Sequence, residues 1–514
     1  MFYGTSHAEP PINNIPAETL CKIFSEMLKS PRTPSTPSSL GPHYENLGLL
    51  KLTAVCRRWR LVASDCATLW TSIAFSTSVR STIQCATLFL GRSKEAMLSV
   101  HIWDSGNFRN PKILPPCNEL LEAIASQSHR LSTCELSSPS PEFWSYWSSP
   151  APNLRNLTVQ GYGAGISPIF CGQIPRLESI TLLNYAPGPL GNYATLRQAD
   201  LRNHNRSILL TSLLDALRGC ERLEKLALHG YARLHHEVSY PPTVSLPLLS
   251  KFDLFSSDSA LILEHLDTPS LTGPVIIFDS SPGDDILHAL PRTQRGSPYL
   301  HGIMKLQVVL NSSTAQYYVA GYREDGSIAL YIGVCGVGHW FRWTWARASI
   351  VAVASFVHFF TIRDLVFTSD APVIPWDVWL PNLNDLRELT VSCPRSEGLL
   401  TSLLKAPLEN GLPPCSSLRS LALYRCGRCA VVDHVGLMGF VASRYQAGRP
   451  IRELKLHKDE WDWIQLLDKS WVALAQFQCT CSEWEIMKNA LMPQKLPREI
   501  TCASTSPSKS TLGC

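Results

Sequence analysis

The sequence predicts an α/β protein with a short helical region at its N-terminus and a much longer region in which brief strands recur. Apolar residues spaced three and four apart before residue 66 indicate amphipathic helices. A hexapeptide with aliphatic residues at its first, fourth and sixth positions recurs from residue 154 onward, and its alternating end is typical of a half-buried strand. With 514 residues, of which 45% are hydrophobic, the chain can bury a large core.

The first helix is expected in the segment INNIPAETLCKIFSEMLKS. Pro16 suits its first turn, because proline has no amide hydrogen to leave unpaired there. The apolar residues of this segment share one helical face: Leu20, Ile23, Phe24, Met27 and Leu28. The pattern stops at residues 30–46, where prolines and serines predict a loop.

A second helical pattern occupies LGLLKLTAVCRRWRLVASDCATLW. Its apolar residues again fall on one face: Leu49, Leu52, Cys56, Trp59 and Ala63. Arg57, Arg58 and Arg60 lie mostly elsewhere around the helix. From the pattern alone, this region could be a small helical core with a solvated arginine face.

Together the two segments resemble an F-box, whose pattern runs Leu-Pro-x-Glu, Ile-Phe, Val-Cys-x-x-Trp and Leu-Trp. The chain matches this order with Ile15-Pro16-x-Glu18, Ile23-Phe24, VCRRW from residue 55 and Leu69-Trp70, although Ile15 replaces the usual Leu and residues 30–46 are inserted. The resemblance implies a three-helix domain over residues 12–72 that binds the Skp-family adaptor of a Skp-cullin-F-box ubiquitin ligase. It implies these adaptor-binding residues: Ile15, Pro16, Leu20, Ile23, Phe24, Val55, Cys56 and Trp59.

The recurring hexapeptide resembles the strand portion of leucine-rich repeats. Its copies start at Leu154, Leu177, Leu196, Leu223, Leu249, Ile303, Ile362, Leu386, Leu418 and Ile451. The resemblance implies an irregular solenoid over residues 151–490, joined to the F-box by a linking segment, 73–150, and followed by a flexible tail, 491–514. The Asn or Cys that usually follows each copy is mostly missing, so ordinary α/β packing is the alternative.

Two features of this long region bear on its surface. Asp325-Gly326 lies between two strand-like runs, which predicts a β-hairpin inserted near residues 307–360.

In addition, the residues between the buried leucines face away from the core in each strand and are polar and varied. We expect a protein target to bind this face, with Asp200, Lys225, Asp253 and Lys455 as candidate contacts. Alternatively, these are only solvated positions of a sheet.

Composition argues against several other functions. The 46 Lys and Arg residues nearly balance 42 Asp and Glu residues, and no basic run suggests nucleic-acid binding. The apolar segment 348–362 is shorter than the roughly 20 residues needed to cross a bilayer, so a buried helix and no membrane partner are expected. No secretory signal is apparent, and the odd number of cysteines, 17, favours reduced thiols in an intracellular protein of the cytoplasm or nucleus.

The candidate chemical motifs are weak. Cys426 and Cys429 form a CxxC, but Cys479 and Cys481 are too closely spaced for a second zinc knuckle, so no metal and no cofactor are expected. No phosphate-binding loop or nucleophile elbow occurs. The sequence therefore predicts a non-enzymatic subunit that recognises a ligase substrate. The alternatives are an enzyme on an α/β scaffold and an F-box protein that acts outside a ligase.

Overall fold

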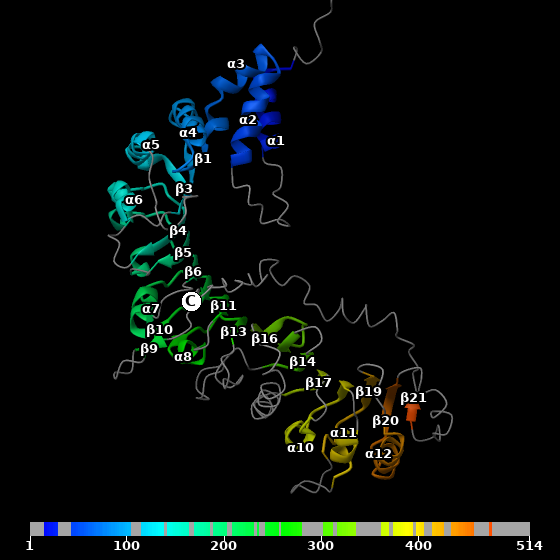
Figure 1. Ribbon diagram of the computed structural model, residues 1–514. Coiled ribbons are helices and arrows are strands. Elements are labelled where there is room, and N and C mark those ends of the chain that lie inside the picture. Colours follow the sequence, from blue (N-terminus) through cyan, green and yellow to red (C-terminus); the bar gives the residue numbers. More distant parts are fainter. Residues whose placement is uncertain are drawn as a thin grey trace, which may run out of the picture. The chain divides into compact units, whose positions relative to one another are not determined.

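The computed structural model describes most of the chain between residues 15 and 456 (Figure 1). The described ranges are 15–28, 43–103, 115–137, 141–163, 169–185, 189–202, 208–230, 234–235, 242–255, 259–279, 302–311, 316–335, 361–369, 374–393, 397–405, 414–425, 433–456 and 472–474. Residues 348–360 of the helix expected at 348–362, both cysteine pairs and the expected tail lie outside these ranges, and residues 361 and 362 are not helical. The chain divides into two compact units, residues 1–249 and 250–514, and each is described by itself.

Unit 1 begins with the helices α1 (Ala17–Leu28), α2 (His43–Val55) and α3 (Arg57–Asp65). The end of the expected loop, residues 43–46, is helical and belongs to α2. The periodicity from Leu49 to Ala63 would fit one helix, but the backbone is extended at Cys56, with φ −155° and ψ 169°. Cys56 is the N-cap of α3, and its Sγ accepts the amide hydrogen of Trp59 at 3.4 Å. The thiol thus starts a new helix without changing the apolar spacing.

A parallel sheet follows directly in unit 1. Its strands pair in chain order: β1 (Ser72–Ser76), β2 (Leu98–Trp103), β3 (Leu131–Ser137), β4 (Asn156–Gly163), β5 (Ser179–Tyr185), β6 (Gln198–Arg202) and β8 (Lys225–His229). The connecting helices α4 (Arg80–Arg92), α5 (Pro115–Ala125), α6 (Pro141–Ser145) and α7 (Leu210–Leu217) lie along one side of these strands in Figure 1. In β8, for example, Leu226 and Leu228 are buried, whereas Lys225, the residue before Leu226, is exposed.

The sheet starts earlier than the sequence predicts. The expected linking segment, 73–150, contributes β1, β2 and β3 to the same parallel ladder as β4. In β3 the buried residue at the fourth position of the hexapeptide is Cys134, and in β2 the alternating residues of LSVHIW are buried without the full motif. A search for aliphatic residues therefore overlooks strands whose burial pattern is the same.

Unit 2 contains a mostly parallel sheet with one reversed strand. Its order is β11 (Lys251–Phe255), β13 (Gly273–Asp279), β16 (Ile328–Cys335), β15 (Gln316–Tyr322), β14 (Lys305–Asn311), β17 (Asp364–Ser369), β18 (Glu388–Cys393), β19 (Ser420–Arg425), β20 (Ile451–Leu456) and β21 (Val472–Leu474). The helices of this unit are α8 (Ser259–Glu264), α10 (Trp376–Trp379), α11 (Glu397–Leu403) and α12 (His434–Gln446).

The reversed strand β15 forms the expected hairpin with β16. The two strands pair antiparallel, and Gly326 in the turn has a φ of 78°, which favours glycine. The Asp325 carboxylate accepts the amide hydrogen of Ser327 at 2.8 Å. Hydrogen bonding to the Ser327 side chain and, second, to the Ser327 backbone amide lowers the pKa of Asp325. Because β15 also pairs antiparallel with β14, the insertion is a three-stranded meander within an otherwise parallel ladder.

Candidate functional site

The interior of the helical module is built around an aromatic pair. Phe24 on α1 is fully buried, and its ring centroid lies 4.9 Å from that of Trp59 on α3. Leu20, one turn before Phe24, is 1% exposed. Leu20 and Phe24, which the resemblance to an F-box assigns to adaptor binding, fill the module's own core in this structure. Their contact with an adaptor stays a prediction.

Other apolar side chains of the same helices remain at the surface. Ile23 is 39% exposed and Val55 is 60% exposed, although the sequence pattern assigned both to a binding role. Met27, one turn after Ile23 on α1, and Leu61 on α3 are also exposed. Pro16 is exposed, and Ile15, Cys56 and Trp59 are half-buried. The helical module thus presents more apolar surface than a solvated face needs, which is typical of a protein-binding region.

The arginines of VCRRWR join the helices to one another. The Arg58 guanidinium donates a short hydrogen bond to the backbone carbonyl of Ile15, just before α1. The Arg60 Nε donates to the carbonyl of Thr53 on α2 at 2.9 Å. These side chains therefore stabilise the arrangement of the helices.

Trp70 attaches the module to the first strand of the sheet. The side chain is fully buried, and its Nε1 donates to the carbonyl of Ala63 in α3 at 2.6 Å. Its ring meets that of Phe89 on α4 edge to face, with centroids 4.9 Å apart, and the Arg92 guanidinium lies 4.4 Å from the indole centroid. β1 starts two residues later. The module and the start of the sheet consequently share one packed interface.

The sheet face of unit 1 displays polar side chains at regular positions. Asp200 on β6 is half-buried and forms an ion pair with Arg202 on the same strand at 2.7 Å. Lys225 on β8 is exposed and pairs in register with Gln198. Two of the candidate target contacts, Asp200 and Lys225, therefore lie on neighbouring strands. Asp200 is already charge-compensated, whereas Lys225 points to solvent.

A hydrogen-bonded chain that the sequence did not indicate crosses β2 and β3 on this unit. The His101 Nδ1 lies 2.9 Å from a Glu135 carboxylate oxygen, and its Nε2 lies 3.1 Å from the Ser99 hydroxyl. The order Ser, His and carboxylate resembles a nucleophilic triad. However, acyl transfer also needs free backbone donors near the serine, and the Ser99 amide donates to the Thr71 carbonyl at 2.9 Å. The chain is therefore better suited to a polar recognition surface.

The candidate contacts of unit 2 are far apart. Asp253 on β11 and Lys455 on β20 lie in the same register row of the sheet. Seven strands lie between β11 and β20, which corresponds to about 38 Å measured across the strands. Lys455 forms an ion pair with Glu453 at 3.1 Å. Burial opposes ionisation of Glu453, but the hydrogen bonds from Lys455 and Ser420 outweigh it and lower its pKa.

The middle of this face is occupied by packed aromatic side chains. Tyr318 and Tyr331 stack with ring centroids 5.5 Å apart, and Tyr331 is 8% exposed. The buried Gln307 amide donates to the Tyr318 hydroxyl at 3.0 Å and accepts from Tyr322 at 2.9 Å. The expected polar face is thus interrupted at the meander, because these side chains pack against one another there instead of facing solvent.

Within the described residues, no group of three or more His, Cys, Asp or Glu side chains is placed to hold a metal ion. The described cysteines are free thiols, and burial raises the pKa of Cys220 to about 11. His235 lies in the short strand β9, Leu234–His235, whereas its neighbour His236 falls outside the described ranges. In the part of the chain that the structure describes, no helix is both long and apolar enough to span a bilayer.

Comparison with known proteins identifies the helical module. The family model named F-box-like matches residues 12–76, which span the three helices and the whole of β1. No curated protein matches the chain. The matched range includes the exposed apolar residues of α1 and α3 together with the buried Phe24 and Trp59. The chain therefore carries an F-box-like domain at residues 12–76.

Proposed function

We propose that the chain is a non-catalytic substrate-recognition subunit of a Skp-cullin-F-box ubiquitin ligase. The F-box-like match is the observation that carries this proposal, because F-box domains bind Skp-type adaptors within cullin complexes. The exposed Ile23 and Val55 supply apolar surface for such a contact, together with Pro16 and the half-buried Ile15, Cys56 and Trp59. The protein would act inside the cell, where its adaptor and cullin are.

The sheets of the two units would form the leucine-rich-repeat-like part of the protein. The strands that begin within the recurring hexapeptides pair with their neighbours and bury their apolar positions, as repeats of this kind do. A protein target would bind the polar side chains on the opposite face, including Asp200, Lys225, Asp253 and Lys455. The separation of the last two favours a broad contact over a small pocket.

The decisive experiment is affinity purification of the full chain and of a variant that lacks residues 12–72. Adaptor and cullin should co-purify only with the full chain, whereas targets should co-purify with both. An adaptor without cullin would favour the F-box protein that acts outside a ligase. Retention of the adaptor by the truncated variant would overturn the proposal. The deletion also removes the buried Trp70, so loss of the targets would place target binding within residues 12–72 only if circular dichroism shows that the sheet remains folded.

Target binding is tested with a second variant in which Asp200, Lys225, Asp253 and Lys455 are all replaced by Ala. Adaptor binding and the circular dichroism spectrum should remain unchanged, while most co-purifying targets are lost.

An enzyme on this scaffold would instead need a concave site with converging reactive groups. Among the described residues, Ser99, His101 and Glu135 form a chain of this general kind, but the Ser99 amide already donates to the Thr71 carbonyl.

A further inference from the structure

The second residue of each hexapeptide forms a column along the edge where the parallel strands begin. Its backbone is held in register, because each of these amides donates to the carbonyl of the equivalent residue on the preceding strand. Arg197 donates to Glu178 at 2.8 Å in unit 1, and Arg419 donates to Arg387 at 2.8 Å in unit 2. Side chains at this position are therefore neighbours across strands, although they are far apart in the sequence.

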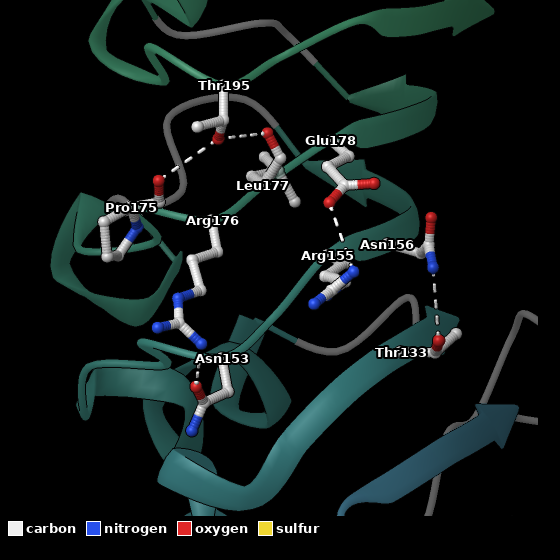
Figure 2. A network of polar contacts seen from close by, with 9 residues as sticks. All are labelled: Thr133, Asn153, Arg155, Asn156, Pro175, Arg176, Leu177, Glu178 and Thr195. Atoms are coloured by element: carbon white, nitrogen blue, oxygen red, sulfur yellow. Dashed lines mark hydrogen bonds and ion pairs between the residues drawn. The ribbon is translucent and has the colours of Figure 1, made fainter.

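In unit 1 the charges of this column alternate. Its members in strand order are Arg155, Glu178, Arg197 and Glu224. Arg155 lies 3.5 Å from the Glu178 carboxylate, and Arg197 lies 3.1 Å from the Glu224 carboxylate. Figure 2 shows the first of these pairs, with Arg155 directed toward Glu178 on the next strand. The column of unit 1 thus neutralises its own charge.

In unit 2, four successive members of this column after Met304 are arginines. These four, at the starts of β17, β18, β19 and β20, are Arg363, Arg387, Arg419 and Arg452. Arg363 lies 3.7 Å from the exposed Glu324 of the hairpin turn. Among the described residues, no side chain forms an ion pair or hydrogen bond with the guanidinium groups of Arg387, Arg419 or Arg452, and all three residues are exposed.

We infer that this arginine column binds an acidic, Asp- and Glu-rich peptide segment of the target protein. Guanidinium groups bind carboxylates through paired, charge-assisted hydrogen bonds, and those of Arg387, Arg419 and Arg452 have no side-chain partner among the described residues. The four strands span about 14 Å, which is the length of about five extended residues. The inference rests on the proposed function, because it assigns one chemical class of target to the recognition sheet.

The residues that directly follow the arginines favour carboxylate over phosphate as the ligand. Asp364, Glu388 and Glu453 lie one residue after the arginines, so negative charge borders the column. A doubly charged phosphate would be repelled by this row more strongly than a singly charged carboxylate. Glu and Asp side chains that approach from the edge of the sheet can reach the arginines and leave the acidic row beside them.

The test measures fluorescence anisotropy of a labelled peptide with a run of about five Glu residues, titrated with the purified full chain. Wild-type protein should bind it, and the affinity should fall as salt is added. The triple variant Arg387→Gln, Arg419→Gln and Arg452→Gln should bind at least about tenfold more weakly. Replacement of the same three by Lys should give an intermediate loss, because charge remains but the paired geometry is lost.

The matched control is Arg155→Gln with Arg197→Gln, which removes arginines from the equivalent column of unit 1, where they already have partners. This variant should bind the peptide as wild type does. Equal binding by wild type and the triple variant, an equal loss in the control, or equal binding of a Gln peptide would each overturn the inference. Tighter binding of a phosphorylated peptide or of heparin would also overturn it, because the occupant would then be another anion.

Adaptor binding by the same preparations separates this inference from the proposed function. If the adaptor binds but the Glu peptide does not, the arginine column has been assigned wrongly and the ligase role stands. If the peptide binds and the adaptor does not, the ligase role fails while the acidic-peptide site remains.

Discussion

Substitution of adjacent residues on α1 should separate the folding of the F-box-like domain from its binding to an adaptor. Phe24 is fully buried against Trp59, so Phe24→Ala should lower the free energy of unfolding by about 3–5 kcal/mol. Ile23 is 39% exposed, so Ile23→Asp removes little from the core. At a protein interface, however, loss of an apolar anchor and burial of a charge should cost at least about 2 kcal/mol, or some thirtyfold in affinity.

The assay combines urea denaturation with a titration of purified adaptor. Ile23→Asp and Val55→Asp should keep the unfolding midpoint of the wild type and lose adaptor affinity, whereas Phe24→Ala should shift the midpoint. Leu88 on α4 has a matched exposure of 38% but lies outside the family match, so Leu88→Asp should leave affinity unchanged. Wild-type affinity in both surface variants would refute the assignment of this face, and a loss in Leu88→Asp would show that the effect is unspecific.

Three further predictions concern stability and thiol chemistry. Arg444 is buried and donates to two backbone carbonyls before β19, at 3.0 and 2.8 Å, so Arg444→Met should lower the free energy of unfolding in urea by about 2–4 kcal/mol. Gly326→Val should lower the melting temperature, since it places a β-branched residue at positive φ at a cost of about 1–2 kcal/mol; an unchanged melting temperature would contradict this. Burial raises the pKa of Cys415 to about 12, so at pH 8 only about one molecule in ten thousand carries its thiolate. Iodoacetamide should therefore modify the exposed Cys171 before Cys415 and reach Cys415 only in urea, as mass spectrometry can follow; rapid native labelling of Cys415 would contradict its burial.

The parts of the fold that depend on local patterns could be predicted from the sequence. The strands begin within the hexapeptides because alternation of apolar residues directly determines which side chains a strand buries. The hairpin at Asp325 and Gly326 followed from a turn whose geometry requires those residues. The strand β3 was missed because Cys134 replaces an aliphatic residue, although a thiol is buried as readily as a small apolar side chain.

Features that depend on strand pairing could not be predicted in this way. The stacking of Tyr318 on Tyr331 depends on the register of β15 and β16. The place of the meander in the ladder depends on pairings between strands far apart in the sequence, β13 with β16 and β14 with β17. On α1, the apolar stripe includes both Ile23 and Phe24. Phe24 is inside because Trp59 of α3 packs against it, whereas Ile23 is exposed. The candidate binding residues could therefore be assigned to a helix but not to one side of it.

The buried Trp70 has a consequence for how a target would be presented. No flexible segment separates α3 from β1, because the indole is hydrogen-bonded to α3 and packed on α4 at the same time. A target held on the first strands of unit 1 would therefore keep a constant orientation relative to a bound adaptor. Which of its lysines comes within reach of the ubiquitin-loaded enzyme would depend on where along these first strands the target binds, and not on movement between the helical module and the strands.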